Sequence, residues 1–262
     1  MIGFVVDLRL KPIVAVVGTM LLLTSGAATS APTKESGFVY GSADDGGDDI
    51  DGQFGPYDYY KPIRIAIPLV ERAHMGYEIA EQARKGDWCG YYLNLDYSLR
   101  ALPNHPKALT LMAEYLETRP TCKPSRESGK TTSGAIWAIE NNAWQERNMD
   151  YYFQTALNFM TEDTRVIPKH AETHVLYADW LRKKKRFDEA MKQYGFAHAL
   201  KPGYANTYYG LGMLYLDQKN IAKATENARK AYSLGKPPAD LQERLVAAGA
   251  WPASAATQKT AP

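Results

Sequence analysis

Apolar residues recur every three or four positions over most of the chain from about residue 62 onward. In the stretch HPKALTLMAEYL, Ala108, Leu111, Met112 and Tyr115 fall on one side of a helical wheel, because an α-helix makes one turn in 3.6 residues. The region offers no convincing alternation of apolar and polar residues of the kind that predicts strands. The pattern predicts an all-α fold.

Proline and glycine divide this helical pattern into segments. Proline has no backbone N–H to donate and disfavours helix continuation, so each cluster predicts the end of a helix. The breaks fall at Pro103–Pro106, Pro120–Gly134, Pro168, Pro202–Gly203 and Gly235–Pro238. Consecutive helices joined at such breaks are expected to form hairpins.

Two consecutive segments, 171–204 and 205–238, carry matching residues at a spacing of 34. The matching positions are Ala178, Leu181, Ala190, Tyr194, Ala197 and Pro202 in the first segment, and Tyr208, Leu211, Gly212, Tyr215, Ala224 and Ala231 in the second. Small residues at such positions let two helix backbones approach, and large residues fill the space beside them. This order resembles the tetratricopeptide repeat (TPR).

The resemblance implies a right-handed superhelix of antiparallel helix pairs, an α-solenoid. It is strong over 171–204 and 205–238 and degenerate over 61–103 and 104–163, where 119–147 interrupts the second degenerate unit. Residues 239–250 are expected to form a capping helix, which covers the last apolar face, and 251–262 a disordered tail.

Residues 1–31 have the order of a secretory signal peptide: Arg9 and Lys11, an apolar run from Ile13 to Leu23, then small residues. The run is shorter than the ~20 residues of a membrane-spanning helix. We therefore expect a periplasmic or secreted protein with no membrane span in the mature chain. An uncleaved amino-terminal anchor is the alternative.

Residues 32–60 are rich in Gly, Asp, Ser and Pro and poor in aliphatic residues, which predicts a flexible acidic leader. The leader also loosely resembles a calcium loop. That interpretation is the weaker one, because Gly52 as the loop glycine would put Gly47 at the first ligand position.

The two cysteines, Cys89 and Cys122, are predicted to lie at the open end of one helix hairpin. In an exported protein this placement favours a disulfide bond, with two free thiols as the alternative. A redox role is not expected, because the chain has no Cys-x-x-Cys pair.

Candidate catalytic and metal-binding groups are few. His170 and His174 are four residues apart and would project from one side of a helix, but they lack a third ligand at metal spacing. Two structural histidines are the preferred interpretation. The chain also lacks a Gly-x-Ser-x-Gly or phosphate-binding loop, so we expect neither catalysis nor a cofactor.

A basic run, residues 182–186, lies at the predicted turn between two helices. A solvated corner is the simpler interpretation, and an acidic protein or an envelope lipid is the alternative partner. The net charge of +2 gives no overall field for nucleic acid, and export also argues against that partner.

In a TPR array the first helix of each pair lines a concave groove, which predicts where a partner binds. The predicted partner-binding residues are Asp179, Arg182, Lys183, Asn206, Tyr209, Met213 and Asp217. Glu172, Val175 and Leu216 share the face, and each of these residues has the alternative of packing against a neighbouring helix. Tyr and Met beside charged groups suit recognition of a peptide or helix.

Three hypotheses follow for function. The first is a non-enzymatic scaffold that binds another envelope or secreted protein. The second is an exported protein that binds a small ligand or a metal within the superhelix. The third is a structural subunit of an extracellular assembly, with possible self-association.

Overall fold

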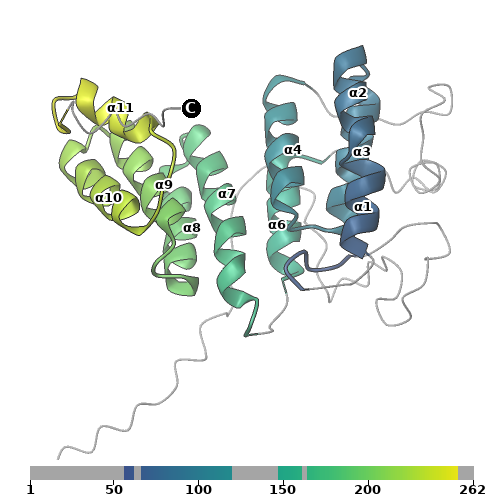
Figure 1. The fold of residues 1–262 in the computed structure, drawn as a ribbon, viewed down its shortest axis with the longest axis horizontal. Coiled ribbons are helices and arrows are strands. Elements are labelled where there is room, and N and C mark those ends of the chain that lie inside the picture. The colour runs from purple at the N-terminus through teal and green to yellow at the C-terminus, as the bar shows by residue number, and fades with distance from the viewer. Residues whose placement is uncertain (1–55, 62–65, 120–146, 161–163, 253–262) are drawn as a thin grey trace, which may run out of the picture.

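The computed structural model describes residues 56–61, 66–119, 147–160 and 164–252, and within these ranges all the regular structure is helical (Figure 1). The predicted all-α class is confirmed for this part of the chain. The predicted signal peptide and Cys122 lie outside the described residues, as do most of the predicted leader and nearly all of the predicted insertion.

The described helices fall into two halves of the chain. In the amino-terminal half they are α1 (Ala66–His74), α2 (Tyr77–Lys85), α3 (Trp88–Ala101), α4 (Pro106–Thr118) and α6 (Met149–Asn158). In the carboxy-terminal half they are a short 3₁₀ turn η2 (Ile167–His170), α7 (Ala171–Lys183), α8 (Phe187–Leu200), α9 (Ala205–Asp217), α10 (Ile221–Leu234) and α11 (Asp240–Ala247).

Helices α9 and α10 begin and end 34 residues after α7 and α8, which is the interval of the sequence repeat. The turns inside the two hairpins also match. Lys185 and Lys219 both adopt positive φ, at 61° and 60°, and the next backbone N–H donates to the carbonyl of Leu181 and of Tyr215, respectively. Both hairpins therefore close through a left-handed residue after the first helix.

Small residues permit the close approach of the helices in these hairpins. Ala178, Ala190 and Ala197 are fully buried between α7 and α8, and three alanines of α10, Ala224, Ala228 and Ala231, are equally buried. Helix α9 also passes close to α8, because the ring of Tyr194 lies against the backbone of Gly210. A side chain at position 210 would collide with that ring.

We expect Gly210→Ala to lower the free energy of unfolding by about 1–3 kcal/mol, because overpacking displaces the buried Tyr194. Gly195→Ala is the matched control on α8. A Cβ there meets nothing within 4 Å, so this change should raise stability by up to ~1 kcal/mol. Urea unfolding of both variants measures the difference, and equal effects would contradict the proposed close approach.

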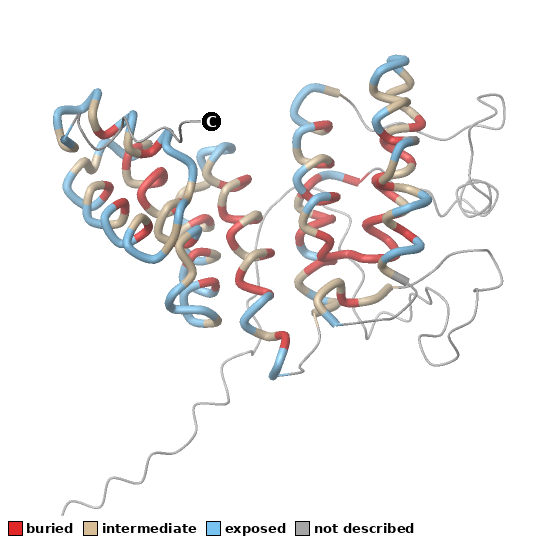
Figure 2. The backbone as a smooth tube through the Cα atoms, viewed as in Figure 1, coloured by how far each residue is buried: buried red, intermediate tan, exposed pale blue. Residues whose placement is uncertain are grey.

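The buried hydrophobic residues form three clusters along the described helices, and Figure 2 marks the buried positions in red. The largest cluster runs from α2 to α9 and includes aromatic residues from α3, α6 and α7. A second cluster, between α9, α10 and α11, contains Leu241 and Leu245, both fully buried. Helix α11 therefore covers the apolar side of the last hairpin, and Trp251 extends this cover by packing edge-to-face on Tyr232.

The amino-terminal half is organised around a buried carboxylate, Asp96 of α3. Its Oδ1 accepts hydrogen bonds from Arg147 Nη1 at 2.5 Å and Tyr152 Oη at 2.7 Å, and its Oδ2 accepts one from Arg100 Nε at 3.1 Å. The side chain of Asp96 is 1% exposed. Burial acts to raise the pKa of Asp96, but the two arginines and Tyr152 outweigh it and hold the pKa below its usual value.

Asp96→Asn should cost about 3–5 kcal/mol at neutral pH, because it removes the buried carboxylate charge with which both Arg100 and Arg147 pair. The depressed pKa means that the carboxylate stabilises the fold above its ordinary pKa of about 3.9 and loses this contribution as pH falls towards the lower folded value. The stability gap between wild type and variant should therefore narrow below about pH 4. Chemical unfolding between pH 7 and pH 3 measures it, and a constant gap would contradict the assignment.

Residues 57–60 bind both halves of the fold. Asp58, which is 6% exposed, pairs with His170 Nε2 at 2.9 Å and accepts a hydrogen bond from Asn104 Nδ2 at 2.8 Å. The hydroxyl of Tyr60 donates to Glu172 at 2.7 Å. The predicted flexible leader extended to residue 60, whereas its last four residues are held by the α3–α4 turn and the start of α7.

Candidate functional site

Helices α4, α7 and α9 are neighbours in the fold, and α11 packs against α9 at the end of the row. Helices α4, α7 and α9 are the first helices of predicted units, and α11 is the predicted capping helix. Helices α8 and α10 pack against one side of this row, and α7 also contacts α6. The candidate site lies between α4, α7 and α9.

This row of helices forms a cavity of ≈ 310 Å³, and we call this cavity the groove. Its apolar lining is Leu109 and Ala113 of α4, Phe153 of α6, Leu176 and Trp180 of α7, and Tyr209 and Met213 of α9. Its polar lining is Thr110, Glu114, Asp179, Arg182, Lys183 and Asp240. An apolar floor with a few convergent polar groups is typical of ligand and peptide sites.

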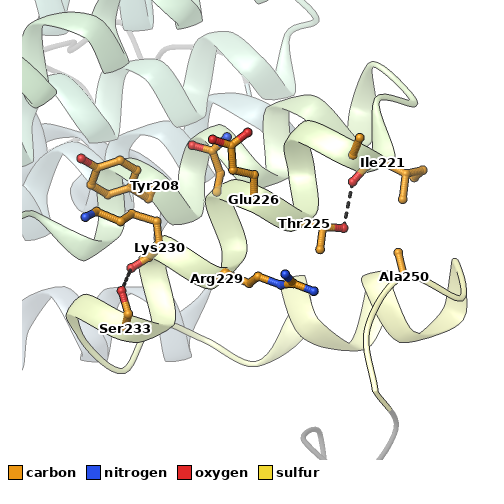
Figure 3. A pocket seen from close by; sticks show the side chains of 10 residues that line it. Tyr208, Ile221, Thr225, Glu226, Arg229, Lys230, Ser233 and Ala250 are labelled. Carbon is orange, nitrogen blue, oxygen red and sulfur yellow. Dashed lines mark hydrogen bonds between the residues drawn. The ribbon is translucent and has the colours of Figure 1, made fainter.

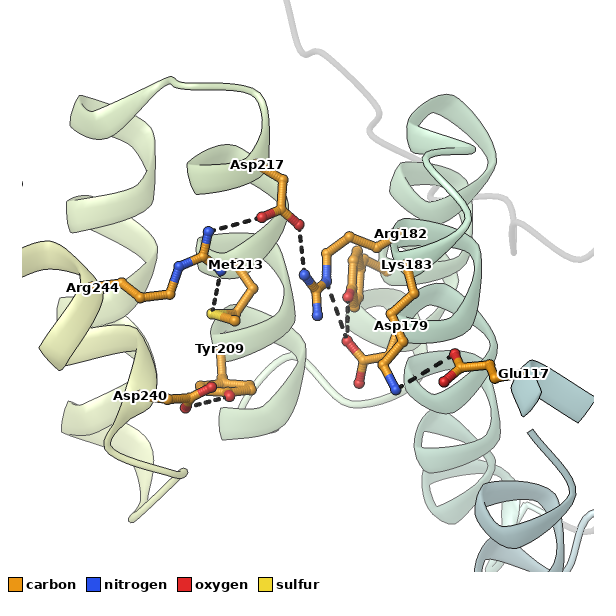
Figure 4. Close-up of polar contacts among 10 residues, drawn as sticks. Glu117, Asp179, Arg182, Lys183, Tyr209, Met213, Asp217, Asp240 and Arg244 are labelled. Carbon is orange, nitrogen blue, oxygen red and sulfur yellow. Dashed lines mark hydrogen bonds and ion pairs between the residues drawn. The ribbon is translucent and has the colours of Figure 1, made fainter. Parts of the chain in front are cut away.

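The structure brings together most of the predicted partner-binding residues. Asp179, Arg182, Lys183, Tyr209 and Met213 all line the groove. Asp217 lies at its edge, bound to Arg182 (Figure 4). Asn206 does not line the groove, because its exposed side chain donates a hydrogen bond to Tyr204 Oη at 3.1 Å. Val175 and Leu216 are buried packing residues.

Arg182 and Asp217 connect α7 to α9 across the groove (Figure 4). Arg182 Nη1 donates to Asp217 Oδ2 at 2.6 Å, and Arg244 Nη2 of α11 donates to the other carboxylate oxygen at 2.9 Å. Arg244 also approaches the sulfur of Met213, at 3.6 Å. One carboxylate therefore links three helices.

Asp179 lies on the α7 side of the groove, opposite Tyr209. Its Oδ1 accepts a hydrogen bond from the buried hydroxyl of Tyr194 at 2.5 Å and lies 4.0 Å from Arg182 Nε. Loss of solvent raises the pKa of Asp179, and this effect outweighs the lowering by Tyr194, Arg182 and Lys183. The carboxylate is thus held by Tyr194 of α8 and lines the groove.

Tyr209 and Asp240 form the opposite side of the groove. The hydroxyl of Tyr209 donates to Asp240 Oδ1 at 2.6 Å, which fixes the ring of Tyr209 across the cavity. Burial, together with the bond to Asp240, raises the pKa of Tyr209 above its usual value. Tyr209 therefore keeps its proton at neutral pH and acts here as a fixed aromatic wall.

We expect the Arg182–Asp217 pair to contribute a coupling free energy of about 0.5–1.5 kcal/mol to stability, because both side chains are mostly covered. A double-mutant cycle with Arg182→Met and Asp217→Asn in thermal or chemical unfolding measures it. The matched control is the Glu81–Arg84 pair within α2, whose arginine is 70% exposed. A coupling no larger than that of the control would contradict an inter-helix role.

The other residues of the basic run, 183–186, end α7, form the turn to α8 or contact α4 and α6. Residues 184–186 connect α7 to α8, as the sequence predicted. Arg186 Nη1 donates to both oxygens of Asp150, at 2.9 and 2.7 Å, and Asp150 also accepts from the hydroxyl of Tyr177 at 2.9 Å. This contact joins α6 to the α7–α8 hairpin. Lys183 lies 3.9 Å from Glu117 of α4.

The two histidines of the candidate metal pair are engaged separately. His170 pairs with Asp58, and His174 Nδ1 lies 2.7 Å from Gln193 Oε1 on α8. Burial lowers the pKa of His174. Among the described residues, no group of three or more His, Cys, Asp and Glu side chains is placed to hold a metal ion. The contacts of both histidines are structural.

A second hollow, of ≈ 940 Å³, lies along α10 (Figure 3). Most of its lining comes from this one helix, including Glu226, Arg229 and Lys230, with Tyr208 from α9 and Ala250 beyond α11. It is larger than the groove, but most of its wall comes from a single helix. Such a surface offers less convergent contact than the groove.

Cys89 lies in the first turn of α3 and packs against the large core cluster. Its predicted bond to Cys122 stays a prediction, since Cys122 lies outside the described residues.

None of the described helices is long and apolar enough to cross a membrane. No family model matches the chain, and no curated protein matches its sequence.

Sequence reasoning missed several groove residues. Glu114 and Ala113 come from α4, in a unit where the repeat signature is degenerate, and Asp240 and Arg244 come from the helix that was expected only to cap the array. The helical period of α4 carried a usable signal, since Thr110, Ala113 and Glu114 are on one side of that helix at spacings of three and four.

Proposed function

We propose that this chain is a non-enzymatic interaction module of TPR type, exported to the periplasm or secreted, whose groove binds a peptide segment or helix of another protein. The observation that carries the proposal is the groove itself. Helices α4, α6, α7 and α9 line it with apolar and aromatic side chains, and α4, α7 and α11 add charged ones.

The helix pairs support the TPR part of the proposal. Two hairpins with equal helix lengths, a 34-residue offset and matching left-handed turns are what a solenoid repeat produces. Stacking of such units leaves their first helices side by side, and α4, α7 and α9 have this arrangement. The α3–α4 and α4–α6 packings extend the same order into the amino-terminal half.

The character of the floor supports a peptide as the ligand. Phe153 and Trp180 are buried and rigidly packed, at 1% and 9% exposure, whereas Tyr209 is only partly buried. Tyrosine side chains such as Tyr209 supply large contact areas in recognition sites, whereas Met213 lines the cavity with only 7% of its surface exposed. A cavity of ≈ 310 Å³ has room for one or two side chains of a bound segment, which would anchor it.

A pair of alanine-to-tryptophan variants tests the proposal. Ala113→Trp fills the groove, and Ala222→Trp adds the same side chain to the exposed hollow along α10. A displayed library of random dodecapeptides is selected on immobilised wild-type protein, and the selected pool is then tested on both variants. We expect Ala113→Trp to reduce binding of the pool at least tenfold and Ala222→Trp to leave it unchanged.

Circular dichroism and thermal unfolding of both variants show whether they fold. If Ala113→Trp unfolds, Leu176→Glu, which puts a charge on a partly buried residue of the same lining, replaces it. Selected peptides that bind both groove variants as well as they bind wild type would overturn the proposal. A library that yields no enriched peptide would overturn it as well.

A further inference from the structure

The groove and its edge carry more acidic than basic side chains. In the part of the chain that the structure describes, the acidic residues at the groove and its edge are Glu114, Glu117, Asp179, Asp217 and Asp240, and the basic ones are Arg182, Lys183 and Arg244. The site is therefore acidic, although the chain as a whole has a formal net charge of +2.

The basic residues of the groove already have carboxylate partners. Arg182 and Arg244 share Asp217, at 2.6 and 2.9 Å, and Lys183 lies 3.9 Å from Glu117. The side chain of Arg182 is only 13% exposed. An incoming anion would have to displace these contacts.

Three carboxylates keep acceptor capacity on the cavity side. Asp179 and Asp240 each use one oxygen to accept a tyrosine hydroxyl, from Tyr194 and Tyr209, and the exposed Glu114 lines the cavity from α4. A carboxylate has two oxygens and several lone pairs, so each of these groups can accept further hydrogen bonds from a ligand.

The carboxylates also act on one another through the cavity. Burial is the main cause of the raised pKa of Asp179, and the negative charge of Asp240 raises this pKa further. The charge of Asp179 in turn adds to the raised pKa of Tyr209. A positive charge placed between Asp179 and Asp240 would relieve this repulsion, and the ring of Tyr209 would offer its face to the same cation.

We infer that the groove selects basic peptide segments, seating an arginine or lysine side chain between Asp179, Asp240 and Glu114 and beside Tyr209. An adjacent apolar residue of the peptide packs on Leu176 and Met213. The inference rests on the proposed function, since it names the chemistry of the segment that the groove would take. The methylene stem of the basic side chain suits the apolar floor, and its charged end reaches the carboxylates.

The test uses the full mature chain and the random dodecapeptide library described above. We expect arginine and lysine to be enriched, relative to the unselected library, among the peptides whose binding Ala113→Trp abolishes. Synthetic versions of one such peptide are then compared by fluorescence anisotropy. Replacing its basic residue by norleucine, which keeps the stem, should weaken binding at least fivefold, and replacing it by glutamate should weaken it further.

Charge-neutralising variants locate the effect on the protein. Asp179→Asn, Asp240→Asn and Glu114→Gln keep the shape of each side chain, and each should weaken binding of the basic peptide about two- to fivefold, as expected for partly exposed ion pairs. Binding of the norleucine peptide should be unaffected. Asp188→Asn, on the exposed first turn of α8, is the control and should change the binding of neither peptide.

The outcomes separate this inference from the proposed function. Groove-dependent peptides without enrichment of basic residues, or with enrichment of acidic ones, would overturn the charge selection and leave the peptide-binding function in place. Equal loss of both peptides in the three carboxylate variants would also overturn it. A selected pool that does not depend on the groove would overturn both.

Discussion

The close approach of α8 to α9 at Tyr194 and Gly210 is the constraint on which the rest of the carboxy-terminal half depends. The ring of Tyr194 is fully buried and fills the space that the missing side chain of Gly210 leaves. Its hydroxyl passes between the helices to Asp179. The same residue therefore sets the separation of two hairpins and fixes a carboxylate of the groove, so packing and site geometry are coupled through one side chain.

The periodicity of the sequence was sufficient to predict the all-α class and the limits of the strongest helices. Ala171 and Ala205 are the first residues of α7 and α9, as the repeat alignment had placed them. Within these helices, residues at spacings of three and four share a face, which is why Asp179, Arg182 and Lys183 reach one cavity with Tyr209 and Met213. The helical spacing rules are sufficient here because α9 and α10 repeat the arrangement of α7 and α8.

Contacts between distant segments were not predictable from the same rules. Asp58 and His170 are 112 residues apart, as are Tyr60 and Glu172, and nothing in their local patterns links them. Asp240 lines the groove, and Arg244 reaches Asp217 at its edge, because α11 packs on α9 through Leu241 rather than by the repeat. Asn206 occupies a predicted groove position of α9, but its side chain donates a hydrogen bond to Tyr204 Oη and does not line the groove.

The buried Asp96 also fixes the start of α6 to α3. Arg147 binds the carboxylate of Asp96, and Arg119, which follows α4, stacks on the ring of Trp88 of α3 at 3.6 Å. The carboxylate therefore positions the residue just ahead of the N-cap Asn148, and through it determines where α6 begins. A single charge in the core of α3 thus orients a helix that lies far from it in the sequence.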